Sequence, residues 1–285
     1  MKKVFITGAA GALGRAVTAY LRGLDQYNVI ATDFCDMGDG GFQLDVCSHD
    51  KLAHAVSSIK PDWVLHLAAT FSNDFNEAYA VNVEASRHLL DAVQKLGFPV
   101  RVLLVGSAAE YGAVQPNENP IREERVLNPV SIYGLTKAWQ TQLAGLYANR
   151  GVDVVVARVF NLDGPGLSKH LFVGSLQKQI AELLAGRKPF IELGPLSAVR
   201  DYLTTMEAAE QILAIATHAK SGGVYHVASG IPVTMRDMLV RYLAKYGLNI
   251  SVVHEAAELS NRSGYDVPAI YADVTRTMSL LKTWR

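Results

Sequence analysis

The sequence predicts an α/β fold in which a doubly wound parallel sheet is joined by a smaller, interleaved C-terminal α/β lobe. Three observations lead to this prediction. Strand-like and helix-like segments alternate along residues 1–160, the strand-like segments are short and almost entirely apolar, and a glycine-rich turn follows the first of them. Near-continuous apolar strands between helices are typical of a parallel sheet covered on both faces. Right-handed crossovers make such a sheet Rossmann-type.

The elements follow in order along the chain. Strands are predicted at 4–7, 29–32, 63–67, 100–105 and 152–160, and helices at 51–59, 77–96 and 133–149, with a first helical pattern starting at Leu13. Beyond residue 160, glycine and proline turns alternate with short elements, which indicates a lobe over the C-terminal edge of the sheet, where open α/β sheets bind ligands. The predicted domains are a Rossmann domain at 1–160 and a mainly substrate-binding lobe at 161–285. Residues 201–228 are expected to return to the sheet, because 224–227 resembles a further strand.

Composition narrows the classes of function. The chain has 285 residues, 49% of them hydrophobic, which suits one large domain or two closely packed ones. Lys+Arg and Asp+Glu both number 27, so no basic excess indicates nucleic acid or an anionic membrane. Cys35 and Cys47 are too few for a disulfide framework, and no Cys/His spacing indicates a metal. No run of about 18 apolar residues could span a bilayer, so we expect a cytoplasmic protein with a small-molecule partner.

The turn after the first strand carries the strongest local signal. Glycines at 8, 11 and 14 give the spacing G-x-x-G-x-x-G. A strand, turn and helix of this kind bring backbone N–H groups at a helix N-terminus against an anion, usually a dinucleotide pyrophosphate. A side chain at Gly8 or Gly11 would obstruct the phosphates, and one at Gly14 would push the helix off the strand. We expect Gly8, Gly11, Ala12, Leu13 and Gly14 to bind the cofactor; an ordinary tight turn is the alternative.

Asp33 closes the second strand, 19 residues after Gly14. A carboxylate there can accept hydrogen bonds from the adenosine ribose hydroxyls, and its charge would repel a 2′-phosphate. This favours NAD as the cofactor, with NADP as the alternative. The other interpretation of Asp33 is a structural role in a surface turn.

Two further segments are candidates for cofactor contacts. Asp45 and Val46 follow another short apolar run and could reach the adenine, or could serve as a loop or helix cap. Leu67, Ala68 and Ala69 end the strand at 63–67. Small residues there let a cofactor lie against the backbone, although they are also common for packing alone.

The catalytic prediction rests on Tyr133 and Lys137. Residues i and i+4 share one face of a helix, so the phenol and the ammonium point into one site. A nearby cation stabilises the phenolate and lowers the tyrosine pKa from about 10, which prepares it for proton transfer. Ser107 follows the strand at 100–105, where a hydroxyl can bond the same substrate oxygen. A solvated helix face is the alternative for this pair.

An ordered set of residues carries a family resemblance: Gly8, Gly11, Gly14, Asp33, Ala68, Ala69, Asn82, Ser107, Tyr111, Gly112, Tyr133, Lys137 and 158–161. Over residues 3–273 the chain resembles the extended short-chain dehydrogenases/reductases, which are mostly NAD(P)-dependent epimerases, dehydratases and reductases of nucleotide sugars. The resemblance implies Ser107, Tyr133 and Lys137 as catalytic residues. It also implies Asn82 and Phe160 as residues beside the cofactor and active site.

Several downstream segments are similar to one subgroup, the GDP-4-keto-6-deoxy-D-mannose reductases. They are 157–166, 172–173, 179–181, 199–203, 225–230 and 266–268. The resemblance implies that the sugar nucleotide contacts Ser107, Ala108, Asn161, Phe172, Val173, Arg200 and Arg262. An arginine can bind a pyrophosphate with two hydrogen bonds. A surface ion pair is the alternative for Arg200 and for Arg262.

The residues after the candidate serine discriminate between reaction types. Dehydratases of this family place an acidic pair there, whereas this chain has Ala108 and Ala109. Reductases that first epimerise carry a cysteine at the position of Ala109. Neither alanine can move a proton, so dehydration and 3,5-epimerisation are not expected. Glu110 departs from the pattern; it either faces the substrate or pairs with Arg122 or Arg125.

These considerations predict hydride chemistry at a sugar carbonyl. In the reductase interpretation, hydride reaches C4 of a nucleotide-linked 4-keto-6-deoxy sugar while Tyr133 protonates the carbonyl oxygen and Ser107 polarises it. The alternatives are a nucleotide-sugar 4-epimerase with tightly bound NAD, and a non-catalytic nucleotide sensor on the same sheet. The resemblance also implies a homodimer through helices 77–96 and 133–149, although apolar residues there could equally face the sheet.

Overall fold

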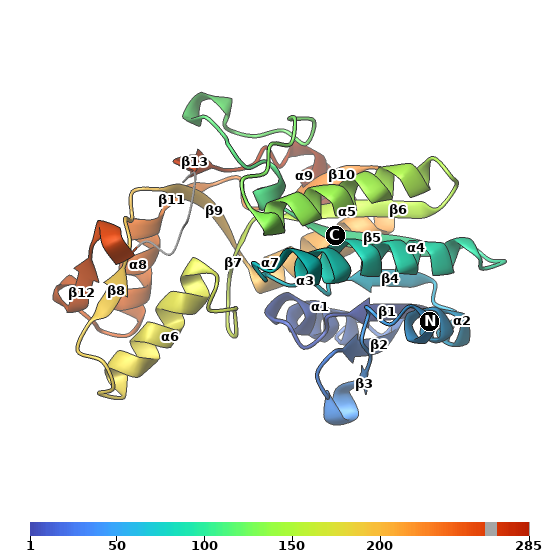
Figure 1. Cartoon of the computed structure of the whole chain (residues 1–285), viewed down its shortest axis with the longest axis horizontal. Helices are drawn as coiled ribbons and strands as arrows, with labels where there is room; N and C mark the ends of the chain where they lie inside the picture. The colour runs from blue at the N-terminus through green and yellow to red at the C-terminus, as the bar shows by residue number, and fades with distance from the viewer. Residues whose placement is uncertain (260–266, 285) are drawn as a thin grey trace.

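The computed structural model describes residues 1–259 and 267–284. A seven-stranded sheet with the strand order β10-β6-β5-β4-β1-β2-β3 forms its centre (Figure 1). All neighbouring strands are parallel. The strands are β1 (Lys2–Thr7), β2 (Tyr27–Asp33), β3 (Phe42–Gln43), β4 (Trp63–His66), β5 (Arg101–Ser107), β6 (Asp153–Val159) and β10 (Val224–Val227). This order, with its reversal beside β1, is that of a doubly wound sheet and confirms the predicted fold class.

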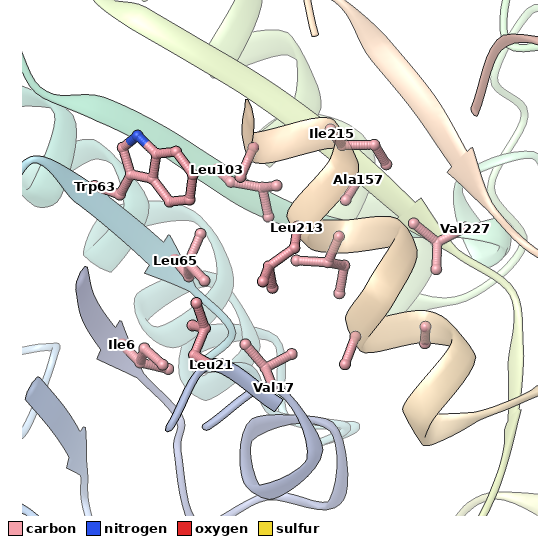
Figure 2. Close-up of a cluster of buried hydrophobic side chains, with 14 of the residues drawn as sticks. Ile6, Val17, Leu21, Trp63, Leu65, Leu103, Ala157, Leu213, Ile215 and Val227 are labelled. Atoms are coloured by element: carbon pink, nitrogen blue, oxygen red, sulfur yellow. The ribbon is translucent and has the colours of Figure 1, made fainter. Parts of the chain in front are cut away.

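Helices cover both faces of this sheet. One face carries α1 (Ala12–Arg22), α7 (Thr205–His218) and α9 (Thr275–Trp284), and the other carries α2 (His49–Ile59), α4 (Ala85–Gln94) and α5 (Ile132–Ala148). Successive residues of β1 alternate between the two cores, since Val4 and Ile6 pack with the first set of helices and Phe5 with the second. Figure 2 shows the first core, with Leu65 and Leu103 of the sheet facing Leu213 of α7.

The predicted elements are found with ends that shift by a few residues, and one of them is interrupted. The helix expected at 77–96 consists of α3 (Phe75–Tyr79), a π-helical segment η2 (Ala80–Glu84) and α4. A π turn accommodates an extra residue and rotates the side chains that follow it. Apolar periodicity does not reveal such a local widening, because the helix continues on either side.

The smaller lobe contains a four-stranded sheet formed by β7 (Asn161–Asp163), β9 (Val199–Thr204), β11 (Pro232–Thr234) and β13 (Ala269–Ile270). A two-stranded sheet of β8 (Ile191–Leu193) and β12 (Val253–Glu255), with α6 (Phe172–Leu184) and α8 (Met235–Lys245), completes it and shares one core. In Figure 1 these elements lie to the left of the main sheet. Between β9 and β11 the chain returns to the main sheet as α7 and β10, so the two parts are interleaved in sequence.

Two features are absent from the described part of the chain. No helix there is long and apolar enough to cross a membrane. The same residues contain no group of three or more His, Cys, Asp or Glu side chains that could hold a metal ion.

Candidate active site

A cavity of about 680 Å³ lies at the carboxyl ends of the central strands, between the main sheet and the smaller lobe. This is the edge at which open α/β sheets bind ligands. Most of the predicted site residues line it. They are Gly8, Gly11, Ala12, Leu13, Gly14, Leu67, Ala69, Ser107, Ala108, Tyr133, Lys137, Phe160, Asn161, Phe172, Val173 and Arg200.

The glycine turn borders the cavity, and close backbone contacts within the protein also exclude side chains from two of its glycines. Gly8 has a φ of +73°, and a Cβ atom on it would lie 2.5 Å from the backbone nitrogen of Ala68. A Cβ atom on Gly14 would lie 2.1 Å from the carbonyl oxygen of Gly8, so this position holds α1 against the turn as predicted. Gly11 is the N-cap of α1 and supplies no side-chain acceptor. Backbone N–H groups at this helix N-terminus therefore line the cavity, where they favour an anion.

Asp33 lies at the end of β2, beside the glycine turn. Its carboxylate accepts hydrogen bonds from the Ala10 N–H at 2.9 Å and the Cys35 N–H at 3.2 Å. The carboxylate is thus held where the turn begins, although it is not among the residues that line the cavity. Its contact with a ribose stays a prediction.

Three other predicted cofactor residues are likewise not among the residues that line the cavity. Asp45 accepts a hydrogen bond from the Cys47 N–H at 2.9 Å and Val46 is buried, which fits the loop role left open above. Ala68 packs its backbone against Gly8. For each of them a direct cofactor contact stays a prediction.

Asn82 belongs to the π-helical segment η2 and is fully buried. Its Oδ1 accepts from the Thr70 N–H at 3.0 Å, and its Nδ2 donates to the Thr70 carbonyl at 3.1 Å and to Thr136 Oγ1 at 3.0 Å. The structure therefore does not bring Asn82 to the cavity. The amide instead ties the loop after β4 to α5, next to Lys137.

Ser107, Tyr133 and Lys137 meet in the cavity. The Ser107 side chain is hydrogen-bonded to Tyr133, and the Phe71 ring lies 4.6 Å from the Tyr133 ring, centroid to centroid. Ser131 caps α5 by accepting from the Gly134 N–H at 3.0 Å. The spacing of i and i+4 thus brings the phenol and the ammonium to one cavity, as the sequence predicts.

The protonation of this pair differs from the prediction. Burial raises the pKa of Tyr133 to about 12, an effect that the hydrogen bond from Ser107 opposes. Burial lowers the pKa of Lys137 to about 8, an effect that the negative charge of Glu110 opposes. The predicted lowering of the Tyr133 pKa is not found, because desolvation of the phenolate dominates and the charge of Glu110 adds to the rise. At neutral pH the phenol carries its proton.

Glu110 has a partner that sequence reasoning missed. It forms a buried ion pair with Arg158, at 2.8 Å between Glu110 Oε2 and Arg158 Nη2, and so pairs with neither Arg122 nor Arg125. Its side chain is fully buried and does not line the cavity. One signal was present in the sequence: Arg158 is a charge in an otherwise apolar strand, and a buried charge requires a partner.

The residues of the smaller lobe reach the cavity from β7, β9 and α6. Arg200 is buried at 7% exposure rather than on the surface, and its Nη1 donates to the Val267 carbonyl at 2.7 Å. Asn161 donates to the Asp201 carbonyl at 3.1 Å. Arg262 lies outside the described residues. Tyr202, which lies in the segment 199–203 singled out above, also lines the cavity. Cavity-lining residues that the sequence did not single out include Phe71, Val130, Ser131, Ser168, His170 and Leu171.

Comparisons with known proteins agree with this geometry. Residues 4–228 match the NAD dependent epimerase/dehydratase family. The chain is 26% identical over 265 residues to GDP-6-deoxy-D-mannose reductase from Pseudomonas aeruginosa, covering 90% of this chain and 84% of that protein. It is also 26% identical over 304 residues to UDP-glucose 4-epimerase from Azospirillum brasilense, covering 95% and 80% respectively. The structure of RMD from P. aeruginosa complexed with NADPH is 23% identical, has a TM-score of 0.85 and covers 99% of this chain and 93% of that one.

The fold and the family match define an NAD(P)-dependent enzyme, and Ser107, Tyr133 and Lys137 line its cavity. The chain belongs to the NAD-dependent epimerase/dehydratase family. The predicted family and NAD(P) dependence are confirmed at this level. Equal identity to a reductase and to an epimerase does not select the reaction or the substrate.

Proposed function

We propose that the protein is an NAD(P)-dependent reductase of a nucleotide-linked 4-keto-6-deoxy sugar, of the GDP-4-keto-6-deoxymannose type. The observation that carries this proposal is the half-buried, protonated phenol of Tyr133, which lines one cavity with Ser107 and Lys137 and is hydrogen-bonded to Ser107. A side chain that holds its proton at neutral pH is suited to protonate a carbonyl oxygen as hydride arrives. The choice of substrate is guided by the segments 157–166 and 199–203, which resemble the GDP-4-keto-6-deoxy-D-mannose reductases.

The residues present fit a dinucleotide cofactor. The backbone at Gly8 and Gly14 leaves no room for side chains, and Gly11 opens the N-terminus of α1 to the cavity. When bound, NAD(P)H supplies the hydride. Asp33, held beside the turn, is proposed to select NAD by accepting from the adenosine ribose hydroxyls.

In the proposed reaction each catalytic residue has one task. Ser107 donates a hydrogen bond to the C4 carbonyl oxygen and polarises it. Tyr133 gives its proton to this oxygen as the C4–H bond forms, so the ketone becomes a secondary alcohol. Lys137 carries a positive charge below about pH 8, which stabilises the phenolate left on Tyr133.

The substrate is proposed to lie toward the smaller lobe. Asn161, Phe172, Val173, Arg200 and Arg262 are the proposed contacts of the sugar nucleotide, with Arg200 facing the pyrophosphate. Ala108 leaves space beside Ser107 without adding an acid or a base.

A 4-epimerase is the second candidate, because the chain is equally identical to UDP-glucose 4-epimerase. That reaction begins with removal of a proton by Tyr133, and a pKa of about 12 opposes this first step. A non-catalytic sensor is the third candidate, and it would not require the Ser–Tyr–Lys centre.

Stoichiometry distinguishes these candidates. The purified protein is mixed with NADH or NADPH and with GDP-, dTDP- and UDP-linked 4-keto-6-deoxy sugars, and absorbance of the reduced nicotinamide is followed. Loss of absorbance equimolar with product supports the reductase. Interconversion of a UDP-hexose with no net change in absorbance would establish the epimerase instead, and binding without turnover would establish the sensor.

A homodimer through α4 and α5 is also proposed. Leu89, Leu90 and Val93 of α4 are buried in the core and so are not available to a partner. Leu146 of α5 is 45% exposed and Phe75 of α3 is 44% exposed. Light scattering coupled to size exclusion is expected to give twice the mass of the chain, and Leu146→Asp is expected to reduce it.

A further inference from the structure

The Glu110 side chain accepts four hydrogen bonds directly beside Ser107. It lies in η3 (Ala108–Glu110), directly after Ser107. Its Oε1 accepts from the Ser107 N–H at 2.7 Å. Its Oε2 accepts from Thr141 Oγ1 at 2.8 Å and from Arg158 Nε and Nη2 at 3.0 and 2.8 Å.

These contacts join the elements that supply the catalytic residues. Ser107 ends β5, Arg158 lies on the neighbouring strand β6, and Thr141 lies on α5 one helical turn after Lys137. One carboxylate thus fixes the serine backbone relative to the helix that carries Tyr133 and Lys137. The chain leaves room for it, since a Cβ atom on Gly106 would lie 2.5 Å from Glu110 Oε1.

The guanidinium of Arg158, which binds Glu110, is also bound by Tyr111. Its Nη1 donates to Tyr111 Oη at 2.7 Å, and the guanidinium lies 4.6 Å from the centroid of the Tyr111 ring. Tyr111 Oη also lies 2.5 Å from His226 Nε2 on β10, and His226 Nδ1 lies 2.9 Å from the carbonyl oxygen of Asp273. A fully buried arginine with several partners cannot change its position without breaking them together.

The charge of Glu110 acts on both catalytic groups. Burial raises the pKa of Tyr133, and Glu110 raises it further; burial lowers the pKa of Lys137, and Glu110 opposes that. The other titratable groups around Lys137 are Tyr133 on its own helix and His66 of β4, whose own pKa burial and the Lys137 charge lower to about 3. His66 is therefore neutral over the working pH range, so Glu110 is the anion to which Lys137 responds.

We propose that Glu110, anchored by Arg158, is a positioning residue for the reaction: it fixes the Ser107 backbone against α5 and places a buried negative charge at Thr141, one helical turn from Lys137, without touching the substrate. The expected effect of Glu110 on kcat rests on the proposed function, whereas its expected effect on the titration of Lys137 does not. The two consequences can therefore be measured separately.

The electrostatic test needs no substrate. The protein is labelled with ¹³C-lysine, and the Lys137 Cε resonance is identified because it disappears in Lys137→Met. The chemical shift of this resonance is followed from pH 6 to pH 11, which gives the midpoint of the Lys137 titration. The parent is expected to titrate near pH 8. In Glu110→Gln the midpoint should fall by roughly one pH unit, because a neighbouring anion has been removed. Glu118→Gln is the matched control: it breaks the Glu118–Arg125 ion pair on a loop and should leave the midpoint unchanged.

The kinetic test uses the reductase assay over the same pH range. In Glu110→Gln, kcat should fall roughly tenfold to a hundredfold because Ser107 is displaced, while KM for the cofactor stays within about threefold of the parent value. The alkaline limb of the pH–rate profile should move to lower pH. A lost kcat with the parent's profile would indicate simple damage and would overturn the proposal.

Removal of one partner of a buried ion pair can prevent folding. The double variant Glu110→Gln with Arg158→Gln removes both charges and lets the two amides bond each other. It is expected to fold and to show the lower Lys137 midpoint and the lower kcat. A parental midpoint in this folded variant overturns the proposal. If no sugar nucleotide is turned over by the parent, the reductase proposal fails, and the titration of Lys137 still decides the role of Glu110.

Discussion

The charged, buried side chain of Lys137 should destabilise the folded protein, and replacing it tests the assignment of the site. The side chain is 1% exposed, and burial lowers its pKa from 10.5 to about 8. A group whose charged form is disfavoured in the folded state destabilises that state while it remains charged. A shift of about 2.5 pH units corresponds to about 3 kcal/mol of free energy of unfolding.

Lys137→Met removes this cost and keeps an unbranched side chain in the space. Glu110 is not left as an unpaired buried charge, because Arg158 still neutralises it. We expect the variant to be more stable than the parent at pH 7 by up to about 3 kcal/mol and to lose turnover. Urea unfolding followed by circular dichroism measures the difference.

The pH dependence of that difference gives the sharper result. Below pH 8 the lysine is protonated in both folded and unfolded states, so the full cost is present. Between pH 8 and pH 10.5 the folded state has released the proton while the unfolded state still binds it, so the parent gains stability with rising pH. The advantage of the variant should therefore shrink over this interval.

Lys178→Met serves as the control for the stability measurements on Lys137→Met. Lys178→Met removes an exposed lysine that pairs with Glu182 and should change stability by less than about 0.5 kcal/mol at every pH. A variant at 137 that is less stable than the parent at pH 7, or whose advantage does not change with pH, would refute the reasoning.

Three further outcomes are expected. Gly14→Ala should prevent α1 from packing against the turn, because the added Cβ would lie 2.1 Å from the Gly8 carbonyl oxygen. A lower Tm and a loss of NADH fluorescence enhancement would measure this effect. The control variant Gly145→Ala has open space around the added Cβ and should fold normally. Tyr133→Phe should lower kcat roughly 10²- to 10⁴-fold and leave NADH binding intact, and a variant with parental turnover would remove Tyr133 from the mechanism. Asp33→Ser should reduce the preference for NADH over NADPH in kcat/KM, and an unchanged preference would show that another group selects the cofactor.

Local patterns in the sequence predicted the parts of the molecule that depend on near neighbours. The apolar strands predicted the central sheet because its central strands, such as β4 and β6, are buried on both faces. The spacing of Tyr133 and Lys137 predicted a shared cavity because an α-helix brings i and i+4 to one side. The steric role of Gly14 also followed from the local turn, and the structure adds the contact with the Gly8 carbonyl.

The features that were missed depend on depth and on distant partners. Glu110 and Arg158 are 48 residues apart, and only the pairing of β5 with β6 brings them together. The protonation of Tyr133 was predicted in the wrong direction, since sequence spacing gives the neighbouring cation but not the extent of desolvation. Asn82, with its three hydrogen bonds, likewise lies in a π-helical segment that apolar periodicity does not show.

Burial has opposite effects on the two catalytic side chains, and this connects the structure to the proposed direction of reaction. Desolvation disfavours the charged form of each, so the phenol retains its proton while the ammonium becomes easier to deprotonate. In the proposed reduction, Tyr133 must start with the proton that it transfers, and Lys137 must start with the proton that gives it a positive charge. Glu110 acts in the same sense for both groups because it favours the protonated form of each. Within the proposed reduction, this carboxylate therefore helps to keep the transferable proton on Tyr133 and the positive charge on Lys137.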